Sequence, residues 1–208
     1  MTDVANGIGM VVVVNPSVPA ESLRDLIALA KRSDKKLTYG TPGVGSGQHV
    51  GTQLFEALAG VELYHVPYKG LPPALTALVA GEIQMMIMAP TTALPYIKNG
   101  KLRVLAYTGG SRWSELPSVP TVMEAGVPGY RFDNFWHALF APRNTRAAVI
   151  SKMQSEVAKA IQVPSVKAAL NAAGYEPVGD TPGEFKKFFL DEIVRWRDIA
   201  RLTKMEPQ

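Results

Sequence analysis

The chain has 208 residues, of which 47% are hydrophobic and 19% charged, a composition typical of a globular protein that excludes a disordered or fibrous chain. Its net charge is +4, but the basic residues form no long run, so we expect no nucleic-acid partner. The absence of cysteine excludes disulfides, a thiolate metal site and a thiol nucleophile.

The first half of the chain alternates short apolar strands with helices. Strands are predicted at residues 9–14, 37–39, 63–66, 83–88 and 102–108. Helices are predicted at residues 22–32, 46–58, 72–80 and 92–98. This alternation favours a parallel sheet covered by helices, so we predict an α/β lobe over residues 10–108.

The second half begins with a stretch rich in Pro and Gly and continues as extended chain, which predicts an inter-lobe connection over residues 109–141. Residues 142–204 are predicted to be mainly helical. Two apolar stripes at helical spacing indicate this: Val149, Ile150, Met153, Val157 and Ile161, then Phe185, Phe188, Phe189, Ile193 and Trp196. Thr181 and Glu184 form a capping box ahead of the second stripe.

Three loops of the first lobe follow a strand and precede a helix: residues 40–47, 67–71 and 88–92. In a parallel α/β sheet such loops lie at one edge, outside the carboxyl ends of the strands, where ligands bind. The sequence therefore predicts a ligand site at this edge.

The first loop is rich in glycine. Gly43, Gly45 and Gly47 allow the backbone to approach a ligand closely, and Ser46 supplies a hydroxyl before a helix whose first amides attract an anion. A carboxylate or phosphate site fits this pattern, and so does a plain strand–helix turn. His49, one turn into the helix, is more typical of a structural hydrogen-bonding residue than of a catalyst.

The other two loops carry weaker signals. Tyr68 and Lys69 fit residues that close over and pair with an anion, although a packed tyrosine and a solvated lysine explain them somewhat better from sequence alone. Thr91 and Thr92 fit helix capping better than ligand binding.

No catalytic motif fits the chain. The first loop is not a Walker loop, Gln48 replaces the last glycine of a dinucleotide fingerprint, and Ser46 stands one place late for a nucleophile elbow. The three histidines lack the spacing of metal ligands. We therefore predict no catalytic residue, no metal and no cofactor.

Four segments in order resemble one family. They are Thr41-Pro42-Gly43-Val44-Gly45-Ser46-Gly47-Gln48-His49, then Val66-Pro67-Tyr68-Lys69-Gly70, then residues 93–106, and then residues 116–130. Together, over residues 11–204, they are similar to the Bug or TctC-type periplasmic solute receptors of tripartite tricarboxylate transporters.

This resemblance implies a type II periplasmic-binding-protein fold with one near-complete parallel-sheet lobe and a partial, mainly helical second lobe. It implies that the chain binds a small organic acid in the periplasm, delivers it to membrane transporter subunits and catalyses nothing. By position, the residues that hold or border the ligand are Thr41, Gly43, Gly45, Ser46, His49, Tyr68, Lys69, Gly70 and Ala89.

The chain departs from the family in two places. In the third loop, Met88 and Ala89 stand where the family usually carries Asp or Asn, which favours a more apolar acid without an ammonium group. The chain as given also has no signal peptide and begins after the usual first part of lobe one, so we expect an exposed apolar surface and self-association.

Two alternatives to a carboxylate receptor stay open. One is a truncated paralogue that binds no ligand and serves as an interaction partner or has no function. The other is a small-acid α/β enzyme built on Ser46 and His49, although no third residue is evident to orient the imidazole.

Overall fold

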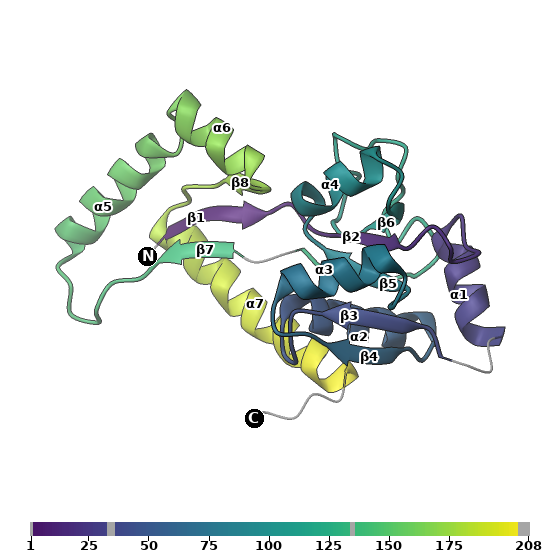
Figure 1. Cartoon of the computed structure of the whole chain (residues 1–208). Helices are drawn as coiled ribbons and strands as arrows, with labels where there is room; N and C mark the ends of the chain where they lie inside the picture. Colours follow the sequence, from purple (N-terminus) through teal and green to yellow (C-terminus); the bar gives the residue numbers. More distant parts are fainter. Residues whose placement is uncertain (1, 33–35, 134–135, 204–208) are drawn as a thin grey trace. The chain divides into compact units, whose positions relative to one another are not determined.

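The computed structural model describes residues 2–32, 36–133 and 136–203, which form two units with a sheet in each (Figure 1). Unit 2 is Gly9–Asp133, and unit 1 combines Met1–Ile8 with Asn134–Gln208. Residues 109–133 of the expected connection therefore belong to unit 2, and the start of the chain joins the C-terminal part. Residues 134–135 and 204 of the expected segments lie outside the described residues.

Unit 2 is built on a five-stranded sheet of order β4-β3-β5-β2-β6. Its strands are β2 (Val11–Val14), β3 (Thr38–Thr41), β4 (Tyr64–Pro67), β5 (Met85–Met88) and β6 (Arg103–Tyr107). Its helices are α1 (Leu23–Arg32), α2 (Gly47–Ala59), α3 (Leu71–Ala80) and α4 (Pro90–Lys98). Each element predicted in this region is present, with ends that shift by at most two residues.

The direction of one strand corrects the parallel-sheet prediction. β3 runs parallel to β4 and to β5, as expected, but β2 runs antiparallel to both of its neighbours, β5 and β6. All four valines of β2 are buried. A continuous apolar run shows that both faces of a strand are covered and carries no information about its direction, so the sheet is mixed.

The core of unit 2 lies on both faces of this sheet. Alternate residues of β2 and β5, among them Val11, Val13, Met86 and Met88, pack with the apolar faces of α3 and α4. The intervening residues point to the opposite face and are equally buried. Helix α2 contacts β5.

Residues 109–133 belong to unit 2, and part of this stretch packs against it. The backbone of Tyr107 pairs with the chain near Thr121, since its amide donates to the Pro120 carbonyl at 2.8 Å and its carbonyl accepts from Val122 N at 2.8 Å. Tyr130 and Phe132 are each only 1% exposed. These scattered apolar residues, separated by Gly and Pro, form no periodic pattern that predicts burial.

Unit 1 contains an antiparallel sheet of order β7-β1-β8 (Figure 1). Its strands are β1 (Thr2–Gly7), β7 (Trp136–Leu139) and β8 (Tyr175–Pro177), and its helices are α5 (Ala147–Ala160), α6 (Pro164–Ala172) and α7 (Pro182–Leu202). β7 falls within the predicted extended segment. β1 and β8 were not predicted, because β1 is largely polar and β8 is only three residues long.

Helix α7 begins as predicted. The Thr181 side chain accepts from the Glu184 amide at 3.3 Å, and the Glu184 carboxylate accepts from the Thr181 amide at 2.9 Å. Behind this cap, Phe185 is fully buried. Its ring centroid lies 5.9 Å from that of Trp136 on β7, so α7 is fixed to the sheet of unit 1 by aromatic contacts.

The other apolar stripe is not a core. Neither α5 nor α6 carries a buried residue, and Val149 and Met153 are 41% and 56% exposed. Ile161, just after α5, is buried at 4%. Unit 1 therefore carries exposed apolar side chains on α5, while the exposed apolar surface and the self-association expected from the sequence stay predictions. Within the described residues, none of the helices has the length and apolar character needed to span a membrane.

A buried carboxylate near the start of β1 makes unit 1 sensitive to pH. Asp3 is 1% exposed, and among the residues that the structure describes its Oδ1 atom has no hydrogen-bond partner. Burial, and after it the negative charge of Asp180, raises the pKa of Asp3 from its ordinary value of 3.8 to about 6. Because the folded-state pKa is the higher one, the charged form destabilises the fold fully above pH 6, and this cost disappears as the pH falls below 3.8.

We therefore expect Asp3→Asn to raise the free energy of unfolding by about 1–2 kcal/mol at pH 7.5. The difference from the unsubstituted chain should shrink to near zero at pH 3.5, where Asp3 is fully protonated in the folded state and mostly protonated in the unfolded state. Urea unfolding at the two pH values measures it. Asp198→Asn removes an exposed carboxylate from the same unit and should change the stability by less than about 0.5 kcal/mol. Equal effects of the two substitutions at pH 7.5 would contradict the assignment.

Candidate functional site

Three strand ends bring the predicted loops to one edge of the unit 2 sheet. β3 is flanked by β4 and β5, and all three run in the same direction. The first two loops are also joined directly. The Tyr68 amide donates to the Thr41 carbonyl at 2.9 Å, and the Gly70 amide donates to the Pro42 carbonyl at 3.0 Å. The common edge that the sequence predicts is therefore present.

The glycine-rich turn has the backbone conformation that its glycines allow. Gly45 has φ +77°, in the left-handed region, and a Cβ placed there would meet nothing within 4 Å. Ser46 is the N-cap of α2, as predicted. Its hydroxyl donates to the Gly43 carbonyl at 2.7 Å and accepts from the His49 amide at 3.3 Å. The turn thus holds its own shape at the start of the helix.

The amides at this helix start differ in their availability to an anion. The Gly45 amide donates to His49 Nδ1 at 3.1 Å. The amides of Gly47 and Gln48, in the first turn of α2, lack an acceptor within the helix by geometry, and they carry the positive end of its dipole. This arrangement suits a carboxylate that approaches the first turn.

Two histidine rings stack beside the turn. The centroids of His49 and His65 are 4.1 Å apart at 18°, and His65 lies 4.9 Å from Tyr39 at 19°. The His65 Nε2 atom is 2.7 Å from the hydroxyl of Thr41, which is itself fully buried. Burial lowers the pKa of His49, and burial together with the charge of His49 lowers that of His65 to about 4. Both rings are therefore neutral at pH 7.

The three predicted residues of the second loop differ in their burial and backbone conformation. Tyr68 is half-buried, and a Cβ on Gly40 would lie 3.4 Å from its ring, so the tyrosine packs over the end of β3. Burial raises the pKa of Tyr68. Gly70 has φ +107° at the N-cap of α3. Lys69 is exposed, which leaves its ammonium group free to reach solvent or a bound anion.

The third loop is apolar where it leaves the sheet. Met88 is fully buried, and half-buried Ala89 is the N-cap of α4, with no side-chain capping bond. The capping role expected for Thr91 and Thr92 is wrong, because both lie inside the first turn. Pro90 occupies the first helical position, where its fixed φ favours helix entry.

The structure thus joins most of the predicted site by hydrogen bonds and leaves two of its members at the periphery. The joined residues are Thr41, Gly43, Gly45, Ser46, His49, Tyr68 and Gly70. Lys69 and Ala89 share the edge without such a bond. The sequence analysis missed His65, although its place opposite Tyr39 in the β3–β4 register brings it to the site. Ligand contact by any of these residues stays a prediction.

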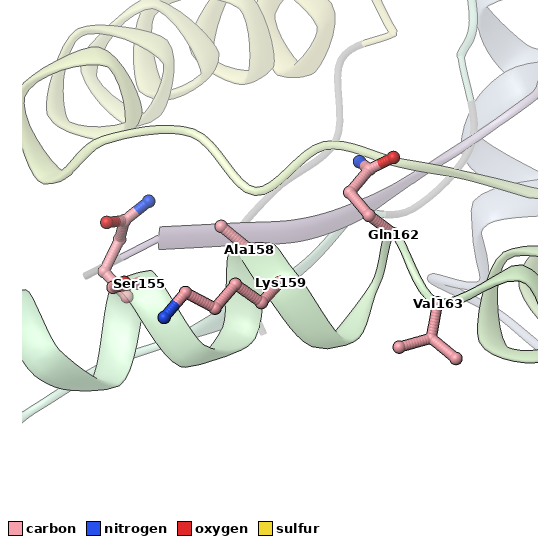
Figure 2. Close-up of a pocket in the computed structure, with 6 residues that line it drawn as sticks. Ser155, Ala158, Lys159, Gln162 and Val163 are labelled. Carbon is pink, nitrogen blue, oxygen red and sulfur yellow. The ribbon is translucent and has the colours of Figure 1, made fainter.

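A separate groove lies in unit 1 along α5. Figure 2 shows its lining residues, which are Gln154, Ser155, Ala158, Lys159, Gln162 and Val163. It encloses about 590 Å³ and is open to solvent. None of the predicted site residues lines it, and its mixture of one lysine, two amides and small side chains shows no convergence of polar groups.

Comparison with known proteins assigns the chain to a family. The model of the tripartite tricarboxylate transporter family receptor, TctC, matches residues 2–204. The chain belongs to this family. The resemblance seen in the sequence is thereby confirmed over nearly the whole of this chain.

Members of this family and related solved structures are similar to this chain in sequence and in fold. BugT of Bordetella pertussis is 34% identical over 194 residues, which are 93% of this chain and 59% of BugT. The structure of Rpa4515 from R. palustris with adipate is 33% identical to this chain, with a TM-score of 0.85. The match covers 100% of this chain and 69% of the Rpa4515 chain. MatC from Rhodopseudomonas palustris with bound malate is 28% identical to this chain, with a TM-score of 0.78. The match covers 95% of this chain and 69% of the MatC chain. These matches confirm the α/β periplasmic-binding-protein fold, and this chain spans about three fifths of BugT.

Proposed function

We propose that this chain is part of an extracytoplasmic receptor that binds a small organic acid at the loop edge of unit 2. The observation that supports this proposal most directly is that β3, β4 and β5 run parallel. The glycine-rich turn, the Tyr68 loop and the Ala89 loop therefore meet at one edge of the sheet. The start of α2 offers a carboxylate the amides of Gly47 and Gln48. Two dicarboxylate-bound structures of the same fold support this choice of ligand class.

In this proposal the partners are the organic acid and the membrane subunits of a tripartite tricarboxylate transporter, and the chain works in the periplasm. The family assignment supports both statements. The chain performs no catalysis in this proposal, since the Ser46 hydroxyl donates to a backbone carbonyl and His49 Nδ1 accepts from a backbone amide. Neither group is arranged as a nucleophile beside its base.

We further propose that the ligand is a dicarboxylic acid without an ammonium group. Met88 is fully buried and Ala89 carries no charge, so the third loop offers no anion to pair with an ammonium group. An ammonium group that loses its water without gaining a partner weakens binding. Adipate should therefore bind at least about tenfold more tightly than aspartate, a difference of about 1.4 kcal/mol.

Titration calorimetry with adipate, malate, aspartate and glutamate tests this selectivity, and tight binding of either amino acid would overturn it. Ala89→Asp is the matched variant, because aspartate is also favoured at the N-cap of α4 and should not impair folding. It should shift the preference toward aspartate.

Thermal unfolding separates a receptor from a paralogue that binds nothing. A ligand present at a hundred times its Kd should stabilise the chain by about 2.7 kcal/mol. No shift with any of the four acids at millimolar concentration would favour the non-binding alternative.

A further inference from the structure

A column of three rings stands beside the glycine-rich turn. His49 from α2 stacks on His65 from β4, and His65 stacks on Tyr39 from β3, with centroid distances of 4.1 and 4.9 Å. His49 is 7% exposed and Tyr39 is 2% exposed. The column therefore connects one helix and two strands through rings that have little room to move.

Each histidine also holds one part of the turn. The Gly45 amide donates to His49 Nδ1 at 3.1 Å, so Nδ1 carries no proton and the neutral ring is protonated at Nε2. The His65 Nε2 atom is 2.7 Å from Thr41 Oγ1. That hydroxyl lies 3.1 Å from the carbonyl oxygen and 3.3 Å from the amide of Gly43. The two rings thus reach both ends of the Gly43–Gly45 segment.

We propose that His49 and His65 are positioning residues of the ligand site, which keep the glycine-rich turn in its binding conformation while His49 is neutral and release it when His49 takes up a second proton. The effect on ligand binding rests on the proposed function, whereas the effect on the turn does not. Neither ring needs to touch the ligand for this role.

The release follows from hydrogen-bond chemistry. A doubly protonated His49 presents N–H groups at both ring nitrogens, so its Nδ1–H would face the N–H of Gly45. Two donors cannot bond to each other, and the Gly45 amide loses its acceptor. The new charge would also lie on the face of His65, at a centroid distance of 4.1 Å, within a buried cluster where a charge is costly.

The direction of the pH effect follows from the direction in which the two pKa values are shifted. Burial lowers the pKa of His49, and that of His65 falls to about 4. Both pKa values lie below the ordinary histidine value of 6.5, so the neutral rings stabilise the turn fully above pH 6.5. This stabilisation is lost as the pH falls through the pKa values of the folded state. The turn should therefore hold at neutral pH and open in acid.

Other titratable groups surround the column and also respond to acid. The described groups are Tyr39 on β3, Glu56 on α2 with its hydrogen bond to Tyr39, Tyr130 with its hydroxyl bonded to α2, and the surface pair Lys36–Glu62 that acts on Glu56. Burial raises the pKa of Glu56, so Glu56 also takes up a proton as the pH falls below neutral. A variant that changes His49 alone is therefore needed to isolate its contribution.

His49→Asn is that variant, because the asparagine side-chain oxygen replaces the Nδ1 acceptor and cannot become charged. NMR titration of the full chain from pH 8 to 4 should show the Gly45 amide and the His49 ring nitrogens changing with one midpoint. In His49→Asn the Gly45 amide should stay constant through this range. His137→Asn, which removes a ring from unit 1, should behave like the unsubstituted chain. A Gly45 amide that ignores the protonation of His49 would overturn the proposal.

Adipate binding provides the functional readout. Protonation of adipate itself weakens binding equally in every variant, so the ratio of Kd values between the unsubstituted chain and His49→Asn is compared at each pH. This ratio should rise about tenfold below the His49 midpoint, the loss expected for one hydrogen bond. A constant ratio would contradict the proposal. If no acid binds at any pH, the proposed function fails, while the Gly45 titration still decides the role of His49.

Variants of His65 test the role of the second histidine. His65→Leu keeps an apolar side chain under His49 but loses the contact with Thr41, and it should weaken adipate binding about tenfold at pH 8. His65→Gln restores a polar group near the Thr41 hydroxyl and should recover most of that loss. Equal affinities of the two variants would show that His65 only fills space.

Discussion

Replacing Phe185 by Ala should lower the free energy of unfolding of unit 1 by about 3–5 kcal/mol. Phe185 is fully buried, and its ring lies 5.9 Å from Trp136 and 5.5 Å from Phe140. Because α5 and α6 contribute no buried residue, α7 supplies much of the apolar contact that unit 1 has. Truncation removes both the buried area and the edge-to-face contacts, and it leaves a cavity.

Urea unfolding followed by circular dichroism and by tryptophan fluorescence measures this effect. The control is Leu190→Ala on the same helix, where the side chain is 51% exposed. It should cost less than about 1 kcal/mol. A loss at Phe185 no larger than that at Leu190 would show that the aromatic cluster does not hold α7 to the sheet.

Gly9→Ala should destabilise unit 2 by about 2–4 kcal/mol. Gly9 has φ +98°, and a Cβ there would lie 2.9 Å from the backbone nitrogen of Gly109 and 3.0 Å from the Tyr107 ring. The backbone nitrogen cannot move aside like the end of a side chain, because the Thr108 amide is bonded to the Met10 carbonyl at 2.8 Å. Conformational strain and a steric clash therefore add.

Gly60→Ala separates these two causes. Gly60 has φ +61° at the end of α2, but a Cβ there would meet nothing within 4 Å. Its replacement should cost only the left-handed strain, about 1–2 kcal/mol. Thermal unfolding of both variants gives the comparison, and equal losses would mean that the contact with Gly109 is relieved at no cost.

The sequence predicted the elements whose signals are local. The apolar run of β2, the amphipathic helix α1 and the caps of α2 and α7 all depend on residues within a few positions of each other. Ser46 and Thr181 accept hydrogen bonds from amides three residues away. Such contacts form in the same way in any surrounding, so the pattern alone is sufficient.

The long-range parts of the fold had no such signal. The antiparallel direction of β2 depends on which strands flank it. Strand β1 exists because β7 and β8 pair with it from more than a hundred residues away. Tyr130 and Phe132 are buried through contacts with distant elements, although they stand among Gly, Pro and charged residues. In each case the partner is absent from the local sequence window.

The candidate site divides in the same way. By itself the sequence determined the glycine-rich turn, the Ser46 cap and the edge where the three loops meet, since strand–turn–helix order and glycine positions are local properties. Only the tertiary structure decided that the Gly45 amide is bonded to His49 and that His65 stacks on this ring and reaches Thr41. These contacts join α2, β3 and β4, and their geometry follows from strand register and helix packing rather than from any motif.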